Sequence, residues 1–181
     1  NANIVLNRLY KHTQMQDSFS MIMLALVDGR PKILNLREII SEYLKHQKEV
    51  VTRRTIFDKK KAEARAHILE GYLIALDNID EIIRIIRSSY NDAKEKLMER
   101  FDLSEIQAQA ILDMQFRRLQ GLEKEKIESE YQELLKKIAY YVELLADEKK
   151  LMGVVKDELI EIRDKWGDKR KTKIKADAQE L

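Results

Sequence analysis

Residues 127–166 read IESEYQELLKKIAYYVELLADEKKLMGVVKDELIEIRDKW, and this stretch decides the fold. Apolar residues recur along it at alternating intervals of three and four, which is the spacing of a coiled-coil seam. Eleven of the twelve seam positions are apolar, and Glu148 is the exception. They are Ile127, Tyr131, Leu134, Ile138, Tyr141, Leu145, Glu148, Met152, Val155, Leu159, Ile162 and Trp166. The repeat predicts a long helix over residues 122–168 that packs along a partner.

The partner helix is expected earlier in the chain. Residues 37–88 contain no Pro and one Gly, Gly71, which predicts one long helix or two nearly collinear ones. The same three-four alternation runs through its later part, at Leu69, Tyr72, Leu76, Ile79, Ile83 and Ile86. The simplest arrangement is an antiparallel pair, with residues 89–121 forming a small helical knob at the turn.

One polar pair offers a register for these helices. If Ile86 lies opposite Ile127, then Arg65 falls opposite Glu148, and each is a polar residue in an apolar seam. We therefore hypothesise an Arg65–Glu148 pair that fixes the register.

The two ends of the chain differ from its middle. Residues 2–12 have helical apolar spacing, and residues 18–36 hold two short apolar runs around Asp28-Gly29. This pattern predicts a helix followed by a β-hairpin, with Pro31 at a sheet edge. Residues 169–181 are predicted to be a basic linker towards a further domain.

Composition favours a mainly α protein and excludes several chemistries. The 181 residues include one Pro, five Gly and no Cys, and 36% are charged. No apolar run reaches membrane-spanning length, so we expect a cytoplasmic protein without membrane contact. The sequence has no phosphate-binding Gly-rich loop, and His12, His46 and His67 are scattered. We therefore expect no catalytic, cofactor or metal site in this chain.

A helix inside the predicted knob has two apolar faces. Ser104 and Gln107 form a capping box that starts it, and Gly121 is expected to end it. One face carries Ala108, Leu112, Phe116 and Leu119, and the other Ile106, Ala110, Ile111 and Met114. Either the knob buries both faces as a small helical cap, or one face meets a second copy of the chain. The candidate dimer interface is Gln107, Ala110, Ile111, Met114, Gln115 and Arg118.

The stretch from Lys45 to Arg65 carries a net charge of +5. It is either a solvated helix face or a surface that faces DNA phosphates. The candidate DNA-facing residues are Arg53, Arg54, Lys59, Lys60 and Lys61.

Two long motifs resemble a known family. They are HQKEVVTRRTIFDKKKAEARAHILEG, residues 46–71, and RFDLSEIQAQAILDMQFRRLQGLEKEKIE, residues 100–128. Both closely resemble the A subunits of bacterial DNA gyrase, which are type IIA topoisomerases, and the resemblance runs from Leu9 to Thr172. The corresponding chain of topoisomerase IV is the second choice.

The resemblance implies the end of the tower domain at residues 1–36, a coiled-coil arm, and an exit gate in the knob where two subunits meet. The parent enzyme would be ATP-dependent and introduce negative supercoils by double-strand passage. Its catalytic tyrosine would lie outside this chain, and ATP and Mg²⁺ would bind the B subunit. The implied partners are a second copy, double-stranded DNA and the B subunit. Two other classes stay open: a purely structural coiled-coil dimerisation module, and a stand-alone DNA-binding module.

Overall fold

The computed structural model describes residues 2–114 and 121–174 and is mainly α, with one small hairpin. In chain order the elements are α1 (Ala2–His12), β1 (Leu24–Val27), β2 (Arg30–Ile33), α2 (Leu36–Asp77), α3 (Ile79–Ser88), α4 (Ala93–Phe101), α5 (Glu105–Leu112), α6 (Gly121–Ala146) and α7 (Glu148–Trp166). The chain divides into two compact units, residues 1–47 with 157–181 and residues 48–156.

The first unit contains the predicted N-terminal helix and hairpin. Strands β1 and β2 pair antiparallel, with Leu26 opposite Pro31. Asp28 and Gly29 both have positive φ, 50° and 74°, as a two-residue hairpin turn requires. Asn35 caps α2: its side-chain oxygen accepts a hydrogen bond from the backbone N–H of Glu38 at 3.0 Å. In return, the Glu38 carboxylate accepts one from the backbone N–H of Asn35 at 2.8 Å.

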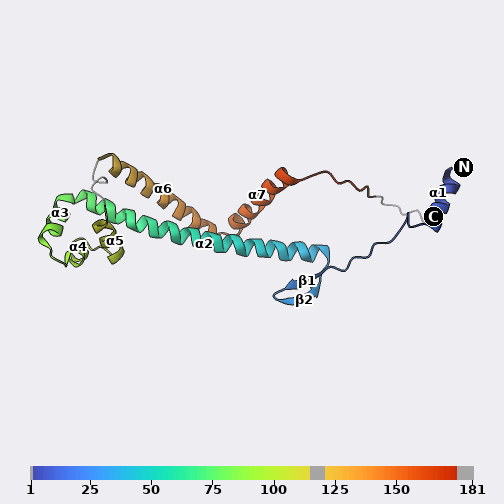
Figure 1. The fold of residues 1–181 in the computed structure, drawn as a ribbon, viewed down its shortest axis with the longest axis horizontal. Coiled ribbons are helices and arrows are strands. Elements are labelled where there is room, and N and C mark those ends of the chain that lie inside the picture. The colour runs from blue at the N-terminus through green and yellow to red at the C-terminus, as the bar shows by residue number, and fades with distance from the viewer. Residues whose placement is uncertain (1, 115–120, 175–181) are drawn as a thin grey trace. The chain divides into compact units, whose positions relative to one another are not determined.

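The second unit is built on an antiparallel helix pair. The later part of α2 lies beside α6 (Figure 1), and two ion pairs join them: Arg65 with Glu130, and Lys124 with Asp77 at 2.5 Å. Small residues, Ala62 and Ala66, are buried on α2. Their burial fits the packing of one helix against another along this stretch of α2.

The predicted outgoing segment, residues 37–88, forms two helices, as one of the two alternatives allowed, but they are not collinear. The chain breaks at Asn78, whose side-chain amide donates to the carbonyl of Ile74 at 2.9 Å, and α3 then begins at Ile79. Figure 1 shows α3 turning away from the line of α2. Burial explains the turn, because Ile82 is packed in a core with residues of α4 and α5 that a straight helix would not reach. The knob therefore begins at Ile79, earlier than predicted, and from here the name covers α3, α4 and α5.

The predicted Arg65–Glu148 pair is also wrong. Arg65 binds Glu130 through two hydrogen bonds, of 2.8 and 3.1 Å, and Glu148 pairs with Lys48. Lys48 lies about five helical turns from Arg65 on α2. The prediction failed because Ile86 belongs to the knob, so Ile127 packs in one cluster with Leu69 and Tyr72 instead.

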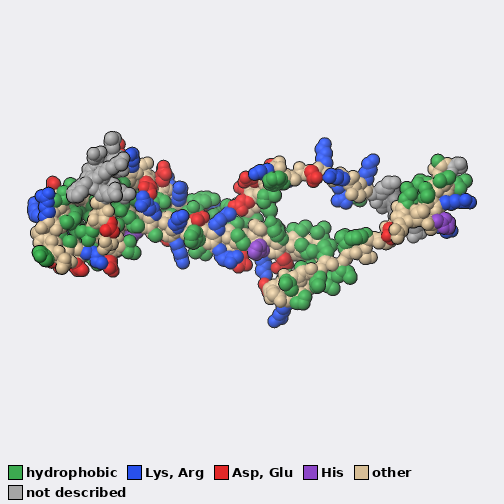
Figure 2. Space-filling view, in the orientation of Figure 1, with side chains coloured by type: hydrophobic (Ala, Val, Ile, Leu, Met, Phe, Trp, Pro, Cys, Tyr) green, Lys and Arg blue, Asp and Glu red, His purple; other side chains and the backbone are tan. Residues whose placement is uncertain are grey.

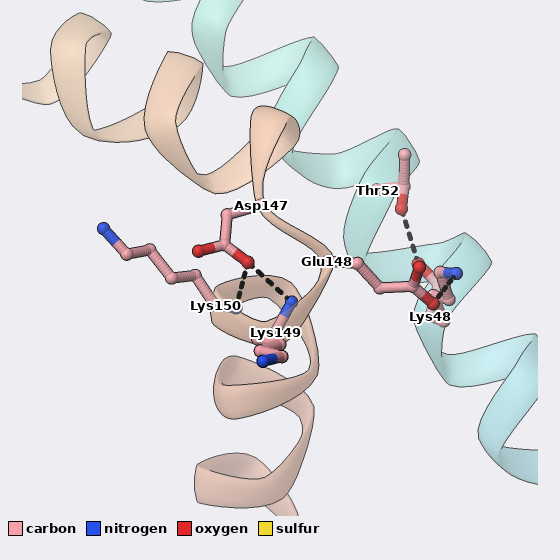
Figure 3. Close-up of polar contacts among 6 residues, drawn as sticks. All are labelled: Lys48, Thr52, Asp147, Glu148, Lys149 and Lys150. Atoms are coloured by element: carbon pink, nitrogen blue, oxygen red, sulfur yellow. Dashed lines mark hydrogen bonds and ion pairs between the residues drawn. The ribbon is translucent and has the colours of Figure 1, made fainter.

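The predicted returning helix, residues 122–168, is interrupted at Asp147. Its carboxylate accepts from the backbone N–H groups of Lys149 and Lys150, at 2.8 and 3.4 Å, and so caps α7 (Figure 3). The neighbouring Glu148 side chain points to Lys48 on α2, as Figure 3 shows. The one polar seam residue thus marks the start of a new helix.

A double-mutant cycle tests the observed register. Arg65→Glu and Glu130→Arg should each lower the free energy of unfolding by about 0.5–1 kcal/mol, because both side chains are partly exposed. The double variant should recover most of the loss in urea denaturation. The same cycle between Arg65 and Glu148 is the control, and measurable coupling there would contradict the register.

Candidate subunit interface

The knob is held together by a core that draws on five helices. Buried apolar residues from α2, α3, α4, α5 and α6 form it, together with Leu103 between α4 and α5: Leu69, Tyr72, Ala75, Ile82, Leu97, Leu103, Ala108, Ile111 and Ile127. Asp102 has a left-handed backbone, with φ of 52°, and its N–H bonds the carbonyl of Met98. This turn ends α4 and lets the chain double back into α5.

Helix α5 is fixed to α2 by a partly buried polar cluster. The predicted capping box is confirmed: the Gln107 N–H donates to Ser104 Oγ at 3.2 Å, and the Ser104 N–H donates to Gln107 Oε1 at 3.0 Å. Gln107 Nε2 then donates to the carbonyl of His67 at 2.8 Å, and His67 Nε2 lies 2.6 Å from Ser104 Oγ. Because Gln107 is only 5% exposed, these bonds satisfy a buried amide.

Ion pairs on the surface join the knob helices to one another. Lys94 on α4 bonds Glu105 on α5 at 2.7 Å, which lowers the pKa of the Glu105 carboxyl. Arg100 on α4 bonds Glu81 on α3 at 2.7 Å, and this hydrogen bond raises the pKa of Arg100. Such exposed pairs orient the helices and add little stability.

The structure divides the predicted interface residues into three groups. Gln107 and Ile111 are 5% and 3% exposed, so both side chains are largely packed in the core, although Ile111 also lines the groove described below; a place in an interface stays a prediction for both. Ala110 and Met114 are half-buried and keep some free surface. Gln115 and Arg118 lie outside the described residues, as do Phe116 and Leu119 of the predicted core face. On that face Ala108 is buried and Leu112 is half-buried.

Gly121 does not end the knob helix as predicted. Helix α5 ends at Leu112, and Gly121 is the first residue of α6. The backbone N–H of Asp113 donates to the Gln109 carbonyl at 3.0 Å, and the N–H of Met114 donates to the Ile111 carbonyl at 3.1 Å, which tightens the last turn of α5.

An apolar groove of about 280 Å³ runs between α3 and the C-terminal end of α5. It is lined by Ile79, Ile82, Ile83, Ile86, Arg87, Ile111, Leu112 and Met114. Figure 2 shows hydrophobic side chains beside Lys and Arg at the end of the unit formed by α3, α4 and α5. Sequence reasoning missed the α3 half because its isoleucines fit a coiled-coil seam equally well.

The predicted DNA-facing residues all lie on α2. Arg53 pairs with Glu49 at 3.7 Å, and Lys59 with Glu63 at 3.1 Å, so acidic neighbours partly balance the strip. Lys60 and Lys61 are exposed. A role in DNA binding stays a prediction for all five, Arg53, Arg54, Lys59, Lys60 and Lys61.

Other kinds of site find little support in the described part of the chain. No cluster of three or more His, Cys, Asp or Glu residues there is arranged to hold a metal ion. Within the same residues, no helix is long and apolar enough to cross a membrane. The groove on the knob is therefore the best-formed candidate site.

Two antiparallel helices that carry a small knob with an apolar groove define a helical arm with a compact helical tip. Comparison with known proteins identifies the family: residues 1–160 match the family model for the A subunit of DNA gyrase/topoisomerase IV. The chain belongs to this family.

Individual relatives agree with the family model. The chain is 58% identical to the DNA gyrase A subunit of Clostridium acetobutylicum over 176 residues, which cover 96% of the chain and 21% of that protein. It is also 58% identical to the DNA gyrase A subunit of Streptococcus pneumoniae, over 96% of the chain and 21% of the relative, and to that of Staphylococcus aureus, over 96% and 20%. The chain thus spans about a fifth of the length of these relatives.

Proposed function

We propose that this chain is the coiled-coil arm and exit gate of a DNA gyrase A subunit, and that the knob is where two subunits meet. The observation that carries the proposal is the open apolar groove between α3 and α5. A second copy of the chain would cover this surface and exclude water from it. The likeness to gyrase A subunits over 96% of the chain supports the gyrase assignment.

The composition of the groove suits a gate that both holds and opens. Isoleucine side chains supply apolar contact when the gate is closed, while the charged Arg87 side chain, which also lines the groove, can be hydrated when the gate is open. A small patch of this kind binds more weakly than a fused core, so the contact is separable. The arm transmits the separation to the rest of the protein.

The whole protein, in this proposal, is an ATP-dependent type II topoisomerase that introduces negative supercoils by double-strand passage. The catalytic tyrosine lies in a part of the protein outside this chain, and ATP and Mg²⁺ bind the B subunit. Double-stranded DNA passes between the arms, where the basic strip on α2 attracts it. The enzyme acts in the bacterial cytoplasm.

Two alternatives make different predictions. The corresponding chain of topoisomerase IV would share the same gate, and assembly with a cognate B subunit would give relaxation without supercoiling. A purely structural dimerisation module would self-associate through the knob but would have no role in strand passage. A supercoiling assay of the full-length protein with its B subunit separates the three.

Self-association of the chain tests the gate. The wild-type chain should sediment as a dimer in analytical ultracentrifugation, and Met114→Glu should sediment as a folded monomer, with affinity at least about tenfold lower, because it places a charge in the apolar groove. Ile106→Glu is the matched control, since Ile106 is 64% exposed on the same helix and does not line the groove. A monomeric wild type, or a Met114→Glu variant that still dimerises normally, would refute the proposal.

A further inference from the structure

Helix α3 presents a second surface that residues 2–114 and 121–174 leave unpaired. Asp80, Ile83, Arg84 and Arg87 line a shallow groove together with Ser88. At about 100° per residue these positions share one face of the helix, and Ile82 points the opposite way into the core. The surface is thus fixed in place by the packing of its reverse side.

Within the described residues, the charged side chains of this surface differ from those around them in making no ion pairs. Across the knob, Glu81 pairs with Arg100, Lys94 with Glu105, and Lys96 with Asp92, all within 2.9 Å. Within the described part of the chain, Asp80, Arg84 and Arg87 make no ion pair or hydrogen bond through their side chains. The helix therefore displays one acid and two bases that the described part of the chain leaves available to a partner.

The order of these charges along α3 is self-complementary. Asp80 and Arg87 are seven residues apart, about two turns, with Ile83 and Arg84 midway between them. If two copies of α3 pack antiparallel about a two-fold axis between positions 83 and 84, Asp80 of each copy meets Arg87 of the other. The helix dipoles are then also antiparallel, which is favourable.

We propose that the gate dimer is organised by this antiparallel α3–α3 contact, with two symmetric Asp80–Arg87 ion pairs flanking Ile83 and Arg84 at the axis. The inference rests on the proposed function, because it names the contact by which two copies meet at the gate. Ile83 and Arg87 line both this surface and the apolar groove, so one partner covers the two together.

The residues themselves favour a protein partner over nucleic acid. Arg and Tyr are enriched in protein interfaces, and Tyr90 just beyond α3 is 99% exposed. Asp80 would oppose a phosphate backbone, whereas a second copy supplies an arginine to meet it. The aliphatic stem of Arg84 can cover Ile83 across the axis while its guanidinium stays in water.

Charge reversal tests the contact in the whole 181-residue chain. Asp80→Arg and Arg87→Asp should each weaken the homodimer at least about tenfold, because both attractive pairs become repulsive. The double variant should dimerise within a few-fold of wild type. Mixing the two single variants should give heterodimers tighter than either homodimer, as followed by sedimentation and native mass spectrometry.

Glu99→Arg is the control for a change of charge alone, since Glu99 is exposed on α4 and lines neither groove. Circular dichroism confirms folding of each variant. If the single variants dimerise as tightly as wild type, or if neither the double variant nor the mixture restores dimerisation, the α3 contact is wrong. The proposed gate itself would still hold in that case, provided that the wild-type chain dimerises and Met114→Glu weakens the dimer. A wild-type chain that never dimerises would overturn both.

Discussion

Replacing Ile111 by Glu is expected to unfold the knob. The Ile111 side chain is 3% exposed and packs in the core formed by α2, α3, α4, α5 and α6. A carboxylate there would have no cationic partner among the core side chains, and an unpaired buried charge is among the most destabilising changes known. We expect a loss of at least about 3 kcal/mol in the free energy of unfolding.

The matched control for this change is Ile106→Glu, on the same helix and with the same substitution. Since Ile106 is 64% exposed, its stability should change by at most about 0.5 kcal/mol. Guanidinium denaturation gives the difference, and amide hydrogen exchange shows whether the loss is confined to the knob. Equal stabilities of the two variants would mean that the Ile111 side chain is not part of the core.

The comparison between Ile111 and Ile106 also shows what the helical wheel misses. Both residues belong to one apolar face of the predicted helix, and the wheel cannot say which face the rest of the chain covers. The polar cluster of His67, Ser104 and Gln107 makes that choice, because it turns α5 so that Gln107 faces α2 and Ile111 enters the core. This contact joins residues about forty apart, from His67 to Gln107, and no local pattern records it.

Two local signals in the sequence predict the structure correctly. The hairpin followed from Asp28-Gly29, whose positive φ angles are favoured by few residues, and the start of α5 followed from the Ser104–Gln107 capping box. Each rests on hydrogen bonds within a few residues of sequence. Such bonds depend little on the rest of the fold.

The predicted register, that is, which residues of α2 face which residues of the returning helices, is wrong because it depends on contacts between residues far apart in the sequence. Heptad spacing tells which face of α2 is apolar, but Ile79, Ile83 and Ile86 continue that spacing past the end of the helix. Because α3 turns away at Asn78, the contact between α2 and α6 starts earlier in the sequence than predicted. Each residue of α2 therefore faces a different residue of the returning helices from the one predicted. Arg65 therefore meets Glu130, and Glu148 meets Lys48.

Gly71→Ala is expected to loosen the attachment of α5 to α2. A Cβ atom at position 71 would lie 2.9 Å from both Cβ and Cγ of Gln107. The Gln107 Cβ is held by its backbone, so relief of the clash requires α5 to move, which strains the Gln107–His67 hydrogen bond. Any gain from placing Ala in a helix, about 1 kcal/mol, is therefore outweighed.

Gly153→Ala provides the matched control, because it makes the same substitution inside helix α7 with no atom within 4 Å of the new Cβ. It should stabilise the chain by about 0.5–1 kcal/mol. Since helix propensity contributes equally to both variants, their difference isolates the clash, and we expect Gly71→Ala to be less stable than Gly153→Ala by about 2 kcal/mol. Equal stabilities of the two variants in thermal and urea unfolding would show that α5 is not packed against Gly71. The position of α5, and with it the groove between α3 and α5, would then not depend on this contact with α2.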